Sequence, residues 1–141
     1  MRPPSIIMFE RLFLASLALS ALSFALSYDS LIEQLAREPG MVELGLGSGF
    51  VIGTAVVGYA IYLLLWFLIA RKASNVAKWV LVVFLALGLI SLLGALAGPW
   101  GLTMLIGLAV YALEIAAAVY LFRPDAAAWL KGKAADPATC D

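Results

Sequence analysis

The sequence predicts an all-α membrane protein: a transmembrane four-helix bundle that runs up, down, up and down, with both termini in the cytoplasm. Hydrophobic residues make up 65% of the 141 residues and charged residues only 13%, whereas an ordinary soluble domain carries roughly 25% charged residues. In addition, four apolar stretches reach the length of about 20 residues that a helix needs to cross a bilayer core of about 30 Å. Lipid cannot satisfy an open strand edge, so these stretches should be helices.

The four predicted spans follow one another closely and form a single transmembrane domain over residues 1–132. They cover about residues 6–28, 50–70, 79–97 and 102–122. The third is expected to follow a helix cap at Ser74 or Asn75. The remaining tail, residues 133–141, is expected to be disordered.

The orientation of the spans follows from the distribution of cations. Eight of the nine Lys and Arg residues flank the predicted inner ends of the spans, and Arg37 alone lies on the other side. Positive residues stay in the cytoplasm when loops are short, so the count predicts that both termini are inside. The interface anchors expected from this orientation are Arg11, Arg71, Lys72, Trp79, Trp100, Arg123 and Trp129.

The N-terminus admits a second interpretation. Arg2, the apolar run behind it and Ala25-Leu26-Ser27 imitate a secretory signal with a small-residue cleavage site. We expect this segment to be retained as the first span, because the charge count is most consistent when it is present. A mature N-terminus at Tyr28 would contradict the four-span prediction.

Two short helices are predicted outside the spans. Ser30 and Glu33 form a capping box, and Glu33 also has the spacing of an ion pair with the arginine four residues later. With apolar residues along one side, this pattern predicts an amphipathic outer helix over about 30–38. Pro124 breaks the fourth span, so a short helix over about 125–131 is expected on the cytoplasmic surface.

Glu114 is the one carboxylate well inside a predicted span. By rise per residue, Tyr62, Ser20 and Gly88 of the other spans lie at about its depth, and Tyr59 supplies another hydroxyl nearby. No Lys, Arg or His lies at that depth to compensate a charge, so we expect the neutral acid. The predicted intramembrane polar cluster is therefore Glu114, Tyr62, Tyr59 and Ser20. It either binds a proton or a cation, or fixes the register of the bundle by hydrogen bonding, which is the more ordinary role.

Small and hydroxyl-bearing residues recur at helical spacing and predict close contacts between helices or subunits. Packing is their expected use, ahead of a polar permeation path. An aromatic stripe of Tyr59, Tyr62 and Trp66 is expected to pack in the core, although it could also hold a quinone or pigment ring. The residues predicted for helix packing are Ser16, Ser20, Ser23, Ser27, Gly49, Gly53, Gly94 and Gly98.

Few side chains are suited to catalysis or ligation. The chain has no histidine and a single cysteine, Cys140, which argues against zinc sites, histidine-based triads and disulfides within the chain. We therefore expect no catalytic residue, no metal and no cofactor. Nine basic residues balance nine acidic ones, so no basic excess points to nucleic acid.

Four segments are informative beyond their composition. They are Arg2-Pro3-Pro4-Ser5, Phe9-Glu10-Arg11-Leu12, the run from Ala70 to Trp79, and Phe122-Arg123-Pro124-Asp125. In these segments the chain resembles a family of small, uncharacterised bacterial inner-membrane proteins with four transmembrane helices. The resemblance implies a bacterial inner membrane and the same topology, and it carries no activity.

The expected function is that of a non-catalytic membrane protein, a structural or accessory subunit that packs in a homo-oligomer or a larger inner-membrane complex. Short loops, few reactive side chains and many packing motifs favour it. The alternative is a proton- or cation-coupled small transporter or channel that uses Glu114, and a lipid- or quinone-associated enzyme ranks third. Membrane lipids are expected partners of the cytoplasmic cations, and a bound quinone, pigment or lipid is an open alternative.

Overall fold

The computed structural model describes residues 2–38, 40, 43–96 and 101–132, and every regular element within them is a helix. Four of these helices are long and apolar enough to cross a membrane, which confirms the predicted helical multi-pass membrane protein by length and composition. The predictions for Gly98, Trp100, Cys140 and the tail 133–141 lie outside the described residues. The helices are α1 (Pro4–Arg37), α3 (Ser48–Ala70), α4 (Asn75–Ala95), α5 (Leu102–Tyr120) and α6 (Pro124–Leu130).

Helix α1 is longer than the sequence predicts. It runs without interruption for 34 residues, so the prediction of a separate amphipathic helix over 30–38, capped at Ser30, is wrong. No glycine or proline lies between Ser5 and Arg37, and therefore nothing breaks the backbone hydrogen bonds of the helix. The predicted ion pair is confirmed, with 3.6 Å between Arg37 Nη2 and Glu33 Oε2. At about 1.5 Å per residue α1 is about 51 Å long and exceeds a bilayer core by several turns.

A tight connection joins α3 to α4. The Ser74 hydroxyl accepts a hydrogen bond from the Ala77 backbone N–H at 3.2 Å, which confirms the predicted cap. Helix α4 therefore begins at Asn75, four residues before the predicted span. Ala73 just before the cap has a φ of +52°, a left-handed conformation that non-glycine residues rarely adopt.

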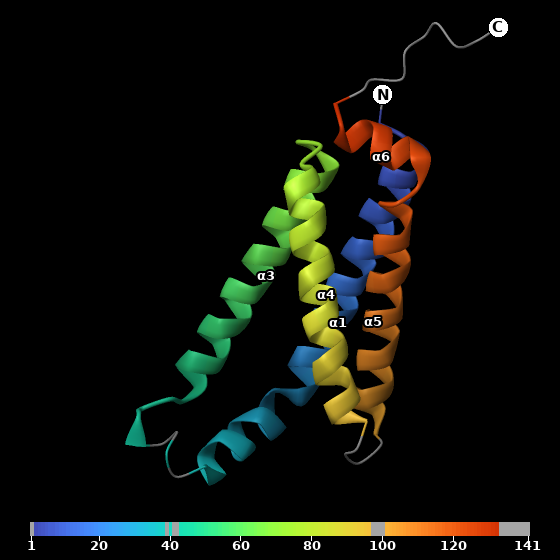
Figure 1. The fold of residues 1–141 in the computed structure, drawn as a ribbon. Coiled ribbons are helices and arrows are strands. Elements are labelled where there is room, and N and C mark those ends of the chain that lie inside the picture. Colours follow the sequence, from blue (N-terminus) through green and yellow to red (C-terminus); the bar gives the residue numbers. More distant parts are fainter. Residues whose placement is uncertain (1, 39, 41–42, 97–100, 133–141) are drawn as a thin grey trace, which may run out of the picture.

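Helix α6 packs against the beginning of α1. The Asp125 carboxylate accepts hydrogen bonds from the backbone N–H of Ser5 at 3.2 Å and from its hydroxyl at 2.9 Å. Ala126 and Leu130 are buried in the same contact. The helix expected to lie on a membrane surface is thus a lid on one end of the bundle (Figure 1).

The hydrophobic core is concentrated at the end of the bundle covered by α6. There the Glu10 carboxylate of α1 pairs with Arg2 and, at 3.5 Å, with Arg71 after α3. Away from this end, α3 diverges from α4 and α5, and the last turns of α1 lean toward the beginning of α3 (Figure 1). The fully buried core side chains are Ile6, Phe9, Phe13, Ile69, Ala70, Leu81, Ala117, Leu121 and Ala126.

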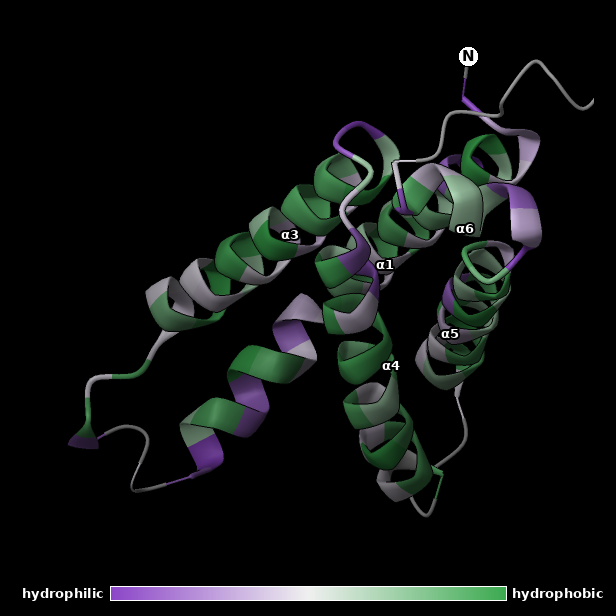
Figure 2. Cartoon of the chain, turned by 45° about the horizontal axis from the view of Figure 1, so that its top comes forward, coloured by the Kyte–Doolittle hydropathy of each residue, from purple (hydrophilic) through white to green (hydrophobic). Residues whose placement is uncertain are grey.

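Apolar side chains cover the outside of the long helices. Figure 2 shows hydrophobic residues around α3, α4 and α5, whereas hydrophilic ones gather at the connections and on the last turns of α1. Val56, Ile90 and Leu105 are each more than half exposed. A surface of this kind faces lipid rather than water.

Candidate functional site

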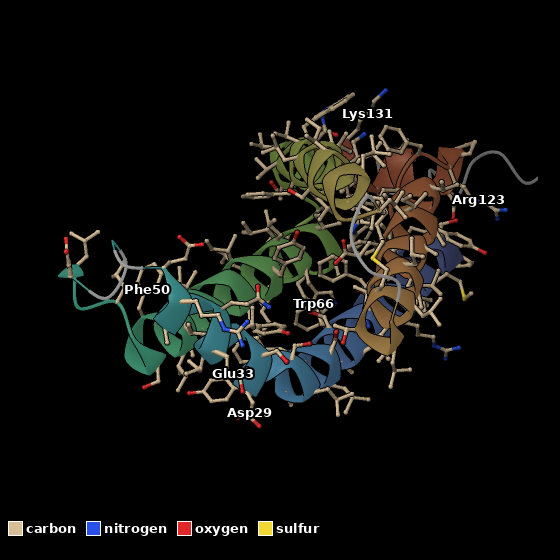
Figure 3. The ribbon with its side chains drawn as sticks, turned by 90° about the horizontal axis from the view of Figure 1, so that it is seen from below. Asp29, Glu33, Phe50, Trp66, Arg123 and Lys131 are labelled. Carbon is tan, nitrogen blue, oxygen red and sulfur yellow. The ribbon has the colours of Figure 1, made fainter. Side chains whose placement is uncertain are left out.

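A cleft of about 510 Å³ lies between α1, α3 and α5, beside the core. Its volume falls in the range of about 300–1,000 Å³ of small-molecule sites. Viewed from below, the four long helices surround the space into which side chains of α1 and α3 extend (Figure 3). The cleft is lined by the polar residues Ser20, Thr54, Tyr59, Tyr62 and Glu114 and by the apolar residues Leu17, Phe24, Phe50, Val51, Ala55 and Gly58.

Helical periodicity gives α3 two different faces. Val51, Ala55, Gly58 and Tyr62 recur at three- and four-residue spacing and line the cleft. Gly49, Gly53, Val56 and Ala60 recur in the same way, on the side of the helix opposite the cleft, and all four are exposed. We call this second set the outer α3 face.

The structure brings the four residues of the predicted polar cluster together. Ser20 of α1, Tyr59 and Tyr62 of α3, and Glu114 of α5 line the same cleft. The hydroxyls of Ser20 and Tyr59 are hydrogen bonded at 2.9 Å, so one of the two tyrosines that could supply a hydroxyl to Glu114 is engaged with α1. The half-buried Glu114 side chain faces the remaining space of the cleft.

Tyr62 is held by aromatic packing. Its ring lies 6.0 Å from the Phe13 ring and 6.1 Å from the Phe84 ring, measured between centroids. Phe13 in turn stacks on Phe9 at 5.3 Å. All three residues of the aromatic stripe therefore pack against the core, as predicted, and Tyr59 and Tyr62 also line the cleft.

No lysine or arginine is among the described residues that line the cleft. The salt bridges within the described part of the chain are at Glu10 and Glu33. The cation–π contacts involve Lys78, Arg71 and Arg123 at the end where α6 lies. Glu114 thus faces the cleft without a cationic partner from its walls.

The four serines of α1 predicted for helix packing lie in three environments, the first of which is the cleft at Ser20. Ser16 is fully buried and donates a hydrogen bond of 2.7 Å to the Phe13 carbonyl, as a packing residue does. Ser23 and Ser27 line a second cavity of about 430 Å³ with Ser30, Gln34 and Thr103. Phe24 lines both cavities, so the cleft and the second cavity share this side chain.

The three predicted packing glycines that lie within the described residues make no close contact with another described helix. A Cβ atom at Gly49, Gly53 or Gly94 would meet no atom within 4 Å, because α3 diverges from the bundle where its glycines lie. Close approach occurs instead at Gly88, where a Cβ atom would lie 3.2 Å from Tyr111 Cε2. The Tyr111 hydroxyl there donates a hydrogen bond to the backbone carbonyl of Leu85 on α4. Subunit contact through the glycines stays a prediction.

The predicted anchors occupy different environments. Arg71 pairs with Glu10, and its guanidinium also lies 5.9 Å from the Trp66 ring. Trp129 is not an exposed anchor, since it packs against the core through α6. Arg11, Lys72, Trp79 and Arg123 are exposed, and the Arg123 guanidinium lies 5.0 Å from the Tyr120 ring.

Sequence reasoning missed several residues of this region. Lys78, counted as a loop cation, is only 8% exposed and lies 4.7 Å from the Phe122 ring and 5.1 Å from the Trp79 ring. Thr54 and Phe24 line the cleft and were not singled out. Their spacing contained the signal, because Thr54 precedes Tyr62 by two helical turns and Phe24 follows Ser20 by one.

No protein-family model, no curated protein and no solved structure matches the chain. Within its described part, no group of three or more histidine, cysteine or acidic residues is placed to hold a metal ion.

Proposed function

We propose that the protein is a non-catalytic subunit of the bacterial inner membrane that assembles through the outer α3 face, with further copies of itself or with a larger complex. The observation that carries this proposal is the exposure of Gly49, Gly53 and Ala60 along one side of a membrane-spanning helix. Small residues let two helix backbones approach closely, and that close packing is what drives helix association in lipid. Within the chain, the described helices leave this face free.

The position of this face supports an intermolecular contact. It points away from the cleft, so a partner helix can pack on it without displacing the side chains that line the cleft. Val56, which is 62% exposed, lies between the small residues and offers a side chain to fill the groove of a facing helix. With both termini in the cytoplasm, as the cation count favours, the short connections leave the apolar helices as the main surface for a partner.

The test is the mass of the native assembly purified in mild detergent. We expect the wild-type chain to be recovered as an oligomer or with co-purifying chains, and Ala60→Leu to weaken that association at least tenfold. Ala86→Leu on α4 is the matched control, because it makes the same change at another exposed helical position. A monomer without co-purifying chains, or an assembly indifferent to Ala60→Leu, would contradict the proposal.

A second candidate function is a proton- or cation-coupled small transporter or channel that uses Glu114. It is favoured by the position of this carboxyl in a cleft that shares the lining residue Phe24 with a second cavity lined by serines. The test is flux through liposomes that contain the wild-type protein or Glu114→Gln. Ion-dependent flux that survives this substitution unchanged would exclude the coupling role.

A further inference from the structure

We infer that the cleft is a binding site for an amphipathic organic cation, an apolar body that carries an ammonium or another onium group. The inference and the second candidate function both use the carboxyl group of Glu114. The inference does not otherwise depend on that function, because a ligand can bind without being transported. It is independent of assembly, since the cleft and the outer α3 face lie on opposite sides of α3. Three features of the cleft support it.

The first feature is the uncompensated carboxyl group. Glu114 is the acidic residue of the lining, and no lysine or arginine accompanies it among the described lining residues. A cationic ligand would supply the missing partner in a site of low polarity, where ion pairing is much stronger than in water. A neutral ligand would fill the space without doing so.

The second feature is the aromatic surround. Phe24, Tyr59 and Tyr62 contribute rings to the walls of the cleft, and aromatic faces attract onium groups by cation–π interaction. Two of these rings are fixed before any ligand arrives. Tyr59 is hydrogen bonded to Ser20, and Tyr62 packs against Phe13 and Phe84. Such a preformed site loses little side-chain entropy on binding.

The third feature is the size and composition of the space. A cavity of about 510 Å³ is much larger than a dehydrated metal ion needs, and Ca²⁺ or Mg²⁺ requires about six or more oxygen ligands. The lining supplies one carboxylate and a few hydroxyls, and the rest is apolar. An organic body of several rings or a branched hydrocarbon matches these walls, and the apolar exterior of the bundle allows it to enter from the membrane.

The test measures equilibrium binding to the full-length protein in nanodiscs of phosphatidylcholine. The probe is tetraphenylphosphonium, and its counterpart is tetraphenylborate, which has nearly the same shape and the opposite charge. Binding to empty nanodiscs is subtracted, because both ions partition into lipid. We expect saturable binding of tetraphenylphosphonium with about one site per chain, and no saturable binding of tetraphenylborate.

Two substitutions localise the site. Glu114→Gln should weaken tetraphenylphosphonium binding at least tenfold, whereas Glu33→Gln, which removes the same charge from an exposed position outside the cleft, should leave it unchanged. Ala55→Trp should also abolish binding by filling the cleft while keeping the carboxyl group. If Glu114→Gln does not fold, as judged by circular dichroism and gel filtration, tetraphenylphosphonium binding to Ala55→Trp tests the inference instead.

Several outcomes overturn the inference. They are the absence of saturable binding, equal binding of tetraphenylborate, and binding that persists in both Glu114→Gln and Ala55→Trp. If the assembly proposal fails, the mass of the native complex shows it independently of ligand binding, because that mass is measured on the same preparations. The failure of transport is recognised by flux, which this binding assay does not involve.

Discussion

Replacing Asp125 by asparagine is expected to weaken the attachment of α6 to α1 and to destabilise the protein by about 1–2 kcal/mol. The carboxylate accepts two hydrogen bonds from Ser5, one from the backbone and one from the hydroxyl. A hydrogen bond to a charged group contributes about 1.5–3 kcal/mol when it is buried. Asparagine keeps one acceptor oxygen and loses the charge. Solvent screens the charge at this half-exposed site, so the loss lies around the lower end of that range, at about 1–2 kcal/mol.

The same contact makes part of the stability dependent on pH. Burial raises the pKa of Asp125, but the hydrogen bonds from Ser5 and from nearby backbone N–H groups outweigh it and hold the pKa below its ordinary value of 3.8. A lowered pKa means that the carboxylate stabilises the fold fully above the ordinary value and that this contribution is lost as the pH falls through the lowered value. Wild-type protein should therefore lose stability below about pH 4, and Asp125→Asn should lack this component.

The measurement is reversible unfolding in mixed micelles, followed by tryptophan fluorescence and circular dichroism at pH 7 and at decreasing pH. Asp29→Asn is the matched control, because Asp29 is exposed and points away from the bundle (Figure 3). If Asp125→Asn changes the free energy of unfolding by less than about 0.5 kcal/mol at pH 7, the usual error of such comparisons, the proposed role of the contact is refuted. Identical acid sensitivity of the two variants would refute the pH argument alone.

Three further substitutions test the packing, each by its unfolding free energy in micelles. Ala73→Gly should stabilise the protein by up to about 1 kcal/mol, because glycine adopts the positive φ without strain; destabilisation would contradict that strain. Gly88→Ala should cost about 1 kcal/mol or more relative to Gly107→Ala. A Cβ atom at Gly88 meets a tyrosine ring of α5 at 3.2 Å, whereas a Cβ atom at Gly107 meets nothing within 4 Å. Equal effects of the two substitutions would count against the close approach at Gly88. Phe13→Ala, at a 1% exposed core position, should cost about 3–5 kcal/mol, and a cost as small as that of the exposed Leu26→Ala would show that the aromatic core is wrongly placed.

The parts of the fold that follow from local chemistry could be predicted. Long apolar runs define the four membrane helices, and the Ser74 cap and the Glu33–Arg37 ion pair depend on residues a few positions apart. Depth along a helix was also enough to bring Glu114, Tyr62 and Ser20 into one cleft, because rise per residue is nearly constant.

The parts that depend on how helices meet could not be predicted. Ser5 and Asp125 are 120 positions apart, and no periodicity links them. The capping box at Ser30 is typical of a helix start, yet the same residues are compatible with the interior of α1 when no glycine or proline precedes them. The direction of the whole helix decides whether its small residues contact another helix of the same chain or a different molecule. The spacing of the small residues does not reveal that direction, so the divergence of α3 could not be predicted from it.

The divergence of α3 makes the molecule broader at the end away from α6 than at the end that α6 covers (Figure 1). A body of this shape displaces more lipid at its broad end than at its narrow end. Any change in the angle between α3 and the rest of the bundle therefore changes the area that the molecule occupies at one membrane level more than at the other.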